Sequence, residues 1–112
     1  MKAKFETLFM EEVRLFLSSL DVKTREKLIY NIDKAALHTD NKLFKKLKGE
    51  IWYLRTLYNK SHYRIFAFWD KTLPTKTLVI ATHGIVKKSD KVPQQEIEKA
   101  ELIRQQYFKI NR

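Results

Sequence analysis

The chain has 112 residues, 44% of them hydrophobic, no cysteine and a formal net charge of +10. This length suits one domain, residues 1–112, and the hydrophobic fraction is large enough to build a core. The lack of cysteine excludes disulfides, thiolate zinc sites and cysteine nucleophiles. The charge favours polyanionic partners, with nucleic acid first and an acidic protein or membrane surface next.

The first third of the chain predicts a short strand and two helices. Residues 2–7 alternate weakly between apolar and polar side chains, as in an edge strand. A helical stripe follows, made of Phe9, Val13, Phe16, Leu17 and Leu20. Asp21 interrupts this stripe, and we expect Thr24 to cap a second helix that ends near His38.

The remainder predicts a hairpin, a third strand and a final helix. Residues 40–49 are predicted to form a basic connector. Segments 51–58 and 63–69 are rich in β-branched and aromatic residues and are predicted to form the two hairpin strands. Residues 77–85 are almost continuously apolar, which is typical of a central strand, and Pro93 suits the first turn of a helix. The order β-α-α-β-β-β-α predicts an α+β domain with an antiparallel sheet and helices packed on one face.

The sequence carries no sign of export or membrane insertion. The N-terminal apolar stretch contains acidic residues, unlike a secretory signal. No apolar run approaches the roughly 18 residues needed to span a bilayer. We therefore expect a cytoplasmic protein with no membrane partner.

Two arginines are the first candidates for chemistry. If residues 59–60 form the hairpin tip, Arg55 lies opposite Arg64 on one face of the sheet, and opposed like charges are destabilising. Guanidinium groups match phosphate oxygens, so two of them on a solvent-open surface could hold a scissile phosphate and stabilise its transition state. The alternative is that each arginine pairs with a helix carboxylate, such as Glu12 or Asp33.

His83 is the candidate for proton transfer, because histidine exchanges protons near neutral pH. Gly84 suggests a bulge or a close backbone approach, and the lysines at 87–88 follow at once. The alternative, more common for a lone histidine, is a partly buried residue with satisfied hydrogen bonds. His38 and His62 have no such neighbourhood, and the spacing of the histidines indicates neither a metal nor another cofactor.

Lysines before and after the hairpin predict a basic rim that tracks a nucleic-acid backbone, although isolated lysines usually form a solvated edge. The candidates for RNA binding are Lys45, Lys46, Lys48, Lys88 and Lys91. Tyr53 is the best candidate for stacking on an unpaired base, because it shares the strand face of Arg55.

Four segments together carry a resemblance that spans about residues 5–107. They are LKGEIWYLR (47–55), YRIF (63–66), HGIVKK (83–88) and PQQEIEKA (93–100). In this order they resemble the phage-derived HigB-like branch of the RelE toxin superfamily. The resemblance implies the toxin of a type II toxin–antitoxin pair, which cuts mRNA in the ribosomal decoding site. In that chemistry the RNA 2′-hydroxyl attacks the adjacent phosphate and leaves a 2′,3′-cyclic phosphate and a 5′-hydroxyl.

The resemblance also implies roles for single residues. Arg64 matches the phosphate-contacting arginine of the family, and Arg55 matches an arginine with a catalytic or supporting role. Lys87 or Lys88 stands where relatives carry a basic residue. Many relatives have lysines on the first hairpin strand and a catalytic tyrosine after the last strand. This chain has neither, so His83 is the first choice for proton transfer and Lys87 the second.

The implied partners are mRNA on the ribosome and a cognate helix-turn-helix (HigA-like) antitoxin. Operator DNA would be bound only through the toxin–antitoxin complex. Two alternatives remain open from the sequence: a non-catalytic RNA- or DNA-binding module that uses the same basic face, and an inactive relative that only binds the antitoxin.

Overall fold

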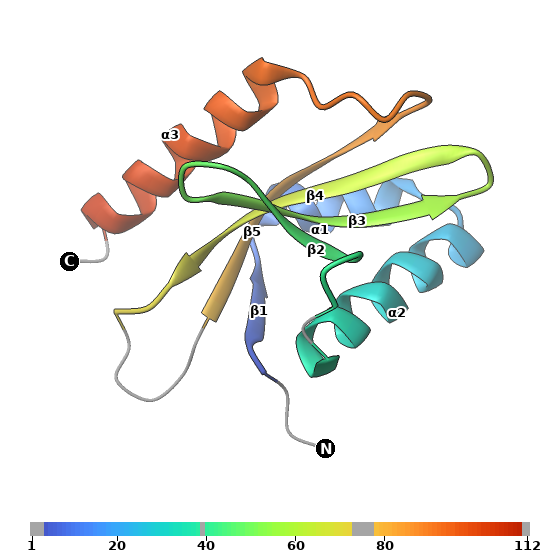
Figure 1. Cartoon of the computed structure of the whole chain (residues 1–112), viewed down its shortest axis with the longest axis horizontal. Helices are drawn as coiled ribbons and strands as arrows, with labels where there is room; N and C mark the ends of the chain where they lie inside the picture. The colour runs from blue at the N-terminus through green and yellow to red at the C-terminus, as the bar shows by residue number, and fades with distance from the viewer. Residues whose placement is uncertain (1–3, 39, 73–77, 111–112) are drawn as a thin grey trace.

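The computed structural model describes residues 4–38, 40–72 and 78–110 and shows three helices around a five-stranded sheet (Figure 1). The α+β class is confirmed. In chain order the elements are β1 (Glu6–Phe9), α1 (Glu11–Ser19), α2 (Val22–His38), β2 (Phe44–Lys48), β3 (Ile51–Tyr58), β4 (Ser61–Asp70), β5 (Leu78–Lys87) and α3 (Gln94–Ile110).

The sheet is mixed and has the order β1-β5-β4-β3-β2. β1 pairs with β5 in parallel, and all the other neighbours are antiparallel. β5 therefore has a partner on each side, as its apolar sequence predicts. In the described part of the chain, no helix has the length and apolar character needed to cross a membrane.

The helices divide between the two faces of the sheet, whereas the sequence predicted them on one face. α1 and α2 pack through Val13 and Leu28 on one side, and α3 packs through Ala100 on the other (Figure 1). The physical reason lies in β4, where Ile65 belongs to the first core cluster and Phe66 to the second. A strand that is apolar on both faces needs a cover on both.

Three local assignments differ from the prediction. Phe9, predicted to begin the first helical stripe, is the last residue of β1, and α1 begins at Glu11. The connector at 40–49 contains β2, whose lysines obscured a short strand with buried Phe44 at its start. Asp21, not Thr24, caps α2, because its carboxylate accepts hydrogen bonds from the Thr24 N–H at 3.3 Å and Oγ1 at 2.5 Å. The first residues of the predicted strands 2–7 and 77–85 lie outside the described residues.

Candidate functional site

The hairpin of β3 and β4 sets the register of the site. Asn59 and Lys60 have φ angles of 52° and 64°, and the strand pairs on either side close a two-residue turn. Turns with two positive φ values match the twist of hairpin strands. The register pairs Arg55 with Arg64, which confirms the predicted opposition of the two arginines.

Arg64 is buried, with 2% of its surface exposed. Its Nη2 donates to the Asp90 backbone oxygen at 2.6 Å and to the Asp90 Oδ1 at 2.5 Å. The expectation of a solvent-open guanidinium is therefore wrong for Arg64, and so is the alternative of a helix carboxylate. The loop between β5 and α3 covers the arginine, although the Asp90 side chain itself is 73% exposed.

The Arg64 guanidinium is only partly satisfied. Its Nε and Nη1 are buried and have no hydrogen-bond partner among the described residues. Its central carbon lies 5.7 Å from the ring centre of Tyr53, which supplies a cation–π contact. Buried N–H groups without an acceptor are unfavourable. An anion that reached this side of the guanidinium could accept hydrogen bonds from them.

Arg55 has a different setting, although it is the strand partner of Arg64. It is half-buried, and its backbone N–H donates to the Leu43 oxygen at 2.8 Å. No ion pair involves its side chain among the described residues. Arg55 therefore retains its charge for an external anion.

His62 lies beside this pair, although the sequence indicated no functional neighbourhood for it. Its Nδ1 is 3.6 Å from the Asp90 Oδ1, and 19% of its side chain is exposed. Lys87, which is exposed, is its register partner on β5. The available signal was strand alternation, which places His62 on the face of Arg64. An imidazole, a guanidinium, a carboxylate and an ammonium thus gather near the hairpin tip.

His83, the predicted proton-transfer residue, is a core residue with 1% exposure. Its Nε2 is 3.1 Å from a Glu96 oxygen and its Nδ1 is 2.9 Å from the Thr82 hydroxyl, so both ring nitrogens have partners. Burial lowers the pKa of His83, the charge of Lys99 lowers it further, and Glu96 opposes both effects. This geometry matches the alternative of a buried, satisfied histidine.

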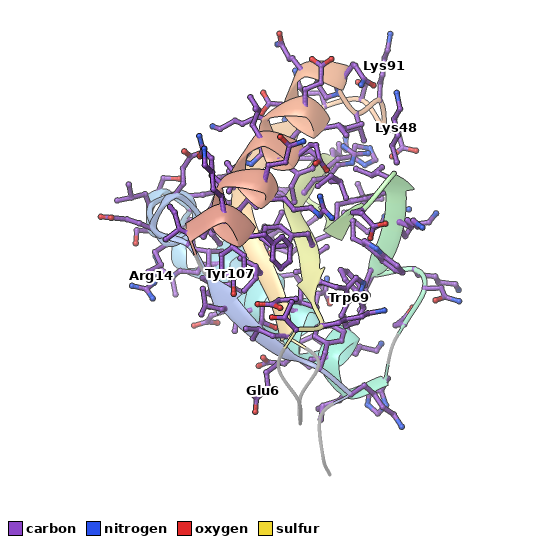
Figure 2. The ribbon with its side chains drawn as sticks, turned by 90° about the vertical axis from the view of Figure 1, so that its left-hand side faces the viewer. Glu6, Arg14, Lys48, Trp69, Lys91 and Tyr107 are labelled. Carbon is purple, nitrogen blue, oxygen red and sulfur yellow. The ribbon has the colours of Figure 1, made fainter. Side chains whose placement is uncertain are left out.

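The predicted rim separates into two groups. Lys45, Lys46 and Lys48 are exposed on β2, near the start of β3, whereas the exposed Lys88 and Lys91 follow β5. Figure 1 shows the β2–β3 turn and the β5–α3 loop at opposite ends of the hairpin, and Figure 2 shows Lys48 and Lys91 projecting from the molecular body. The predicted rim therefore draws its lysines from two separate parts of the fold.

Tyr53 and Tyr107 belong to, or pack against, the core between the sheet and α3. Tyr53 is 7% exposed and belongs to the core under α3, which leaves no open face for a base. The Tyr107 hydroxyl donates to Asp70 at 2.6 Å, six residues along β4 from Arg64, or roughly 20 Å. Burial and this hydrogen bond raise the pKa of Tyr107 to about 12. Tyr107 therefore fastens α3 to the sheet, far from the arginine pair.

Comparison with known proteins adds one assignment. A search of curated proteins found no match. The family model described as phage derived protein Gp49-like (DUF891) matches residues 15–105. That family is associated with RelE-like toxins. The match includes the hairpin, the Asp90 loop and most of α3. The residues that surround Arg64 thus lie within the matched region, and the chain belongs to the Gp49-like family of phage-derived proteins.

Proposed function

We propose that this protein is the toxin of a type II toxin–antitoxin pair and cleaves mRNA, in the manner of HigB-like toxins on the ribosome. The observation that carries the proposal is the buried Arg64, with Nε and Nη1 unpaired, next to His62 and Asp90. A site with unused donors beside a titratable imidazole suits phosphate chemistry. The +10 charge and the toxin-associated family support the same class of substrate.

In this proposal the scissile phosphate replaces the Asp90 carboxylate on Arg64, and Arg55 contacts the same phosphate. The 2′-oxygen bonds to phosphorus while the bond from phosphorus to the 5′-oxygen breaks. His62 accepts the proton of the 2′-hydroxyl, and the Lys87 ammonium protonates the departing 5′-oxygen. The products are a 2′,3′-cyclic phosphate and a 5′-hydroxyl, and both residues regain their protonation states from water.

The proposal also assigns partners. A helix-turn-helix antitoxin of the HigA-like class would block the basic surface or hold the toxin off the ribosome, and the complex would bind operator DNA. Such a toxin acts on translated mRNA, which places its activity in the cytoplasm. A small helix-turn-helix gene beside the toxin gene would support this assignment.

The direct experiment is induction of the protein in a bacterial host. We expect growth arrest and new mRNA 5′ ends within translated codons. Arg64→Ala should abolish both at equal expression, because the phosphate loses its main cation. Binding of the antitoxin by the variant serves as the control for folding. If Arg64→Ala remained fully toxic at equal expression, the proposed contact between Arg64 and the scissile phosphate would be contradicted.

A second candidate, a non-catalytic RNA- or DNA-binding module, is favoured by one observation. The Asp90 loop closes over Arg64, so the resting site is not open to a phosphate. Such a module would bind RNA without producing new 5′ ends. An inactive relative would bind the antitoxin and show neither toxicity nor cleavage.

A further inference from the structure

A basic groove lies between α2 and the end of β3, and of its lining residues only Arg55 has a role in the proposed function. Its volume is about 440 Å³. It is lined by Lys27, Asn31, Lys34, Lys42, Leu43, Arg55 and Leu57. Four of these seven side chains are cationic and none is acidic, so the groove suits an anionic ligand.

The wall formed by α2 is built and held in place. Lys27, Asn31 and Lys34 follow the i, i+4, i+7 spacing and therefore share one helix face. The two lysines are separated by roughly 10 Å along the helix axis. Asn31 is 9% exposed, and its amide donates to the Thr56 hydroxyl on β3 at 3.0 Å. This buried hydrogen bond ties the helix to the strand on the other side of the groove.

The groove lysines Lys27, Lys34 and Lys42 form no ion pair among the described residues. Elsewhere the chain does pair its surface cations, as Lys99 with Glu12 at 2.6 Å. Cations gathered without a carboxylate repel one another, and an anion that binds there relieves the repulsion.

The groove is continuous with the proposed cleavage site. Arg55 lines the groove and is the register partner of Arg64. Leu57, which is 57% exposed, also lines the groove and is the register partner of His62. Arg55 and Leu57 both follow Leu54, the last β3 residue paired with β2, so a polymer at the arginine pair would reach the groove around this edge of the sheet.

We propose that this groove binds the backbone of single-stranded RNA next to the scissile phosphate, with Leu57 contacting a ribose or base. The inference rests on the proposed function, because that function supplies the polymer. It adds the path of the substrate, which runs along α2 and away from α3. RNA is favoured over an acidic peptide because the groove shares Arg55 with the phosphate site.

The test uses the full-length protein and a labelled 2′-O-methyl oligouridylate, which lacks the attacking hydroxyl. Affinity is measured between ~50 and ~200 mM NaCl for the unmodified protein and for the variant Lys27→Gln, Lys34→Gln, Lys42→Gln. All three lysines are exposed, so the fold should be retained, as unfolding temperatures would verify. The matched control, with the same loss of charge at exposed positions away from α2, is Lys71→Gln, Lys99→Gln, Lys109→Gln.

We expect the groove variant to bind roughly tenfold or more weakly, with a slope of log affinity against log salt that is less negative by about 2. This follows because each single-strand phosphate contact contributes ~0.7 to the slope. The control should keep most of the affinity and slope. Equal slopes for the two variants would overturn the inference, as would loss of antitoxin binding with RNA binding intact.

The result also separates this inference from the proposed function. If the protein binds RNA through the groove but never cuts RNA, the groove inference is supported and the proposed nuclease activity is contradicted. If the unmodified protein cleaves mRNA but the salt slope of RNA binding is unchanged in the groove variant, the nuclease activity is supported and the groove inference is contradicted.

Discussion

At the scale of single residues, Arg64 combines burial with unused hydrogen-bonding capacity. In the part of the chain that the structure describes, only its Nη2 has acceptors, both on Asp90, while Nε and Nη1 are buried without partners. An unsatisfied buried donor costs about 1–3 kcal/mol. Asp90, by contrast, is largely exposed. The loop can therefore release the arginine with little loss of packing around Asp90, and a phosphate can take the place of the carboxylate.

Asp90→Asn tests this competition. The substitution keeps the size of the side chain and removes the charge that competes with phosphate, so binding of the uncleavable oligouridylate should tighten several-fold. The salt slope should become more negative by ~0.7, which corresponds to one more phosphate contact. Ser89→Asn in the same loop is the control. Weaker binding by Asp90→Asn would show that the carboxylate supports the site and does not occupy it.

His62 shows where residue-level reasoning from sequence fell short. The register prediction placed Arg55 opposite Arg64 correctly, because strand composition and a two-residue tip determine it. The same register puts His62 beside Lys87. The proposed role of His62 depends on its contact with Asp90, which lies 28 positions further along the chain in a loop without periodic pattern. Local patterns cannot predict the path of such a loop.

At the scale of elements, the sequence was most informative where side chains repeat with a regular period. α2, α3 and the hairpin lie close to where periodicity predicted them, whereas the first helix begins two residues later than its predicted stripe, because Phe9 belongs to β1. β2 was missed because its lysines alternate with few apolar residues. The prediction that α3 packs on the same face as α1 and α2 was also wrong. The apolar run of β4 allows a cover on either face, and only the packing of α1 and α2 decides between them.

His83 joins two of these elements, since it lies on β5 and contacts Glu96 on α3. Lys99 and Glu12 are the other charged groups whose fields act on its pKa. The pKa in the folded protein is lowered, mainly by burial, so the unfolded chain binds more protons as pH falls through its ordinary value of 6.5. The free energy of unfolding should therefore decrease from neutral pH toward lower pH and level off below the folded pKa.

Urea unfolding at several pH values measures this dependence, with His83→Gln as the comparison. Glutamine keeps hydrogen-bonding groups but does not titrate, so the variant should lose stability less steeply between neutral and mildly acidic pH. His38→Gln is the control, because His38 is exposed. Parallel curves for the unmodified protein and His83→Gln would place the acid sensitivity on other groups.

At the scale of the whole molecule, the net charge of +10 predicts an attraction to polyanions. The distribution of that charge over the surface could not be predicted from the sequence. The groove draws its cations from α2, from the segment before β2 and from β3, which are separated in sequence. The lysines predicted to form one rim come from β2 and from the segment after β5. Tertiary packing thus determines which cations act together.

This distribution implies a conflict between stability and binding. Unpaired cations repel one another in the compact state, and a like-charged groove concentrates that repulsion. Neutralising Lys27, Lys34 and Lys42 should therefore raise the unfolding temperature at low salt by a few degrees, which corresponds to ~0.5–1 kcal/mol. The control variant should gain less, because Lys99→Gln breaks the ion pair with Glu12. Thermal unfolding in increasing NaCl should bring the variants together, since salt screens exposed charges. A groove variant less stable than the control at low salt would show that these lysines stabilise the fold and are not held there for a ligand.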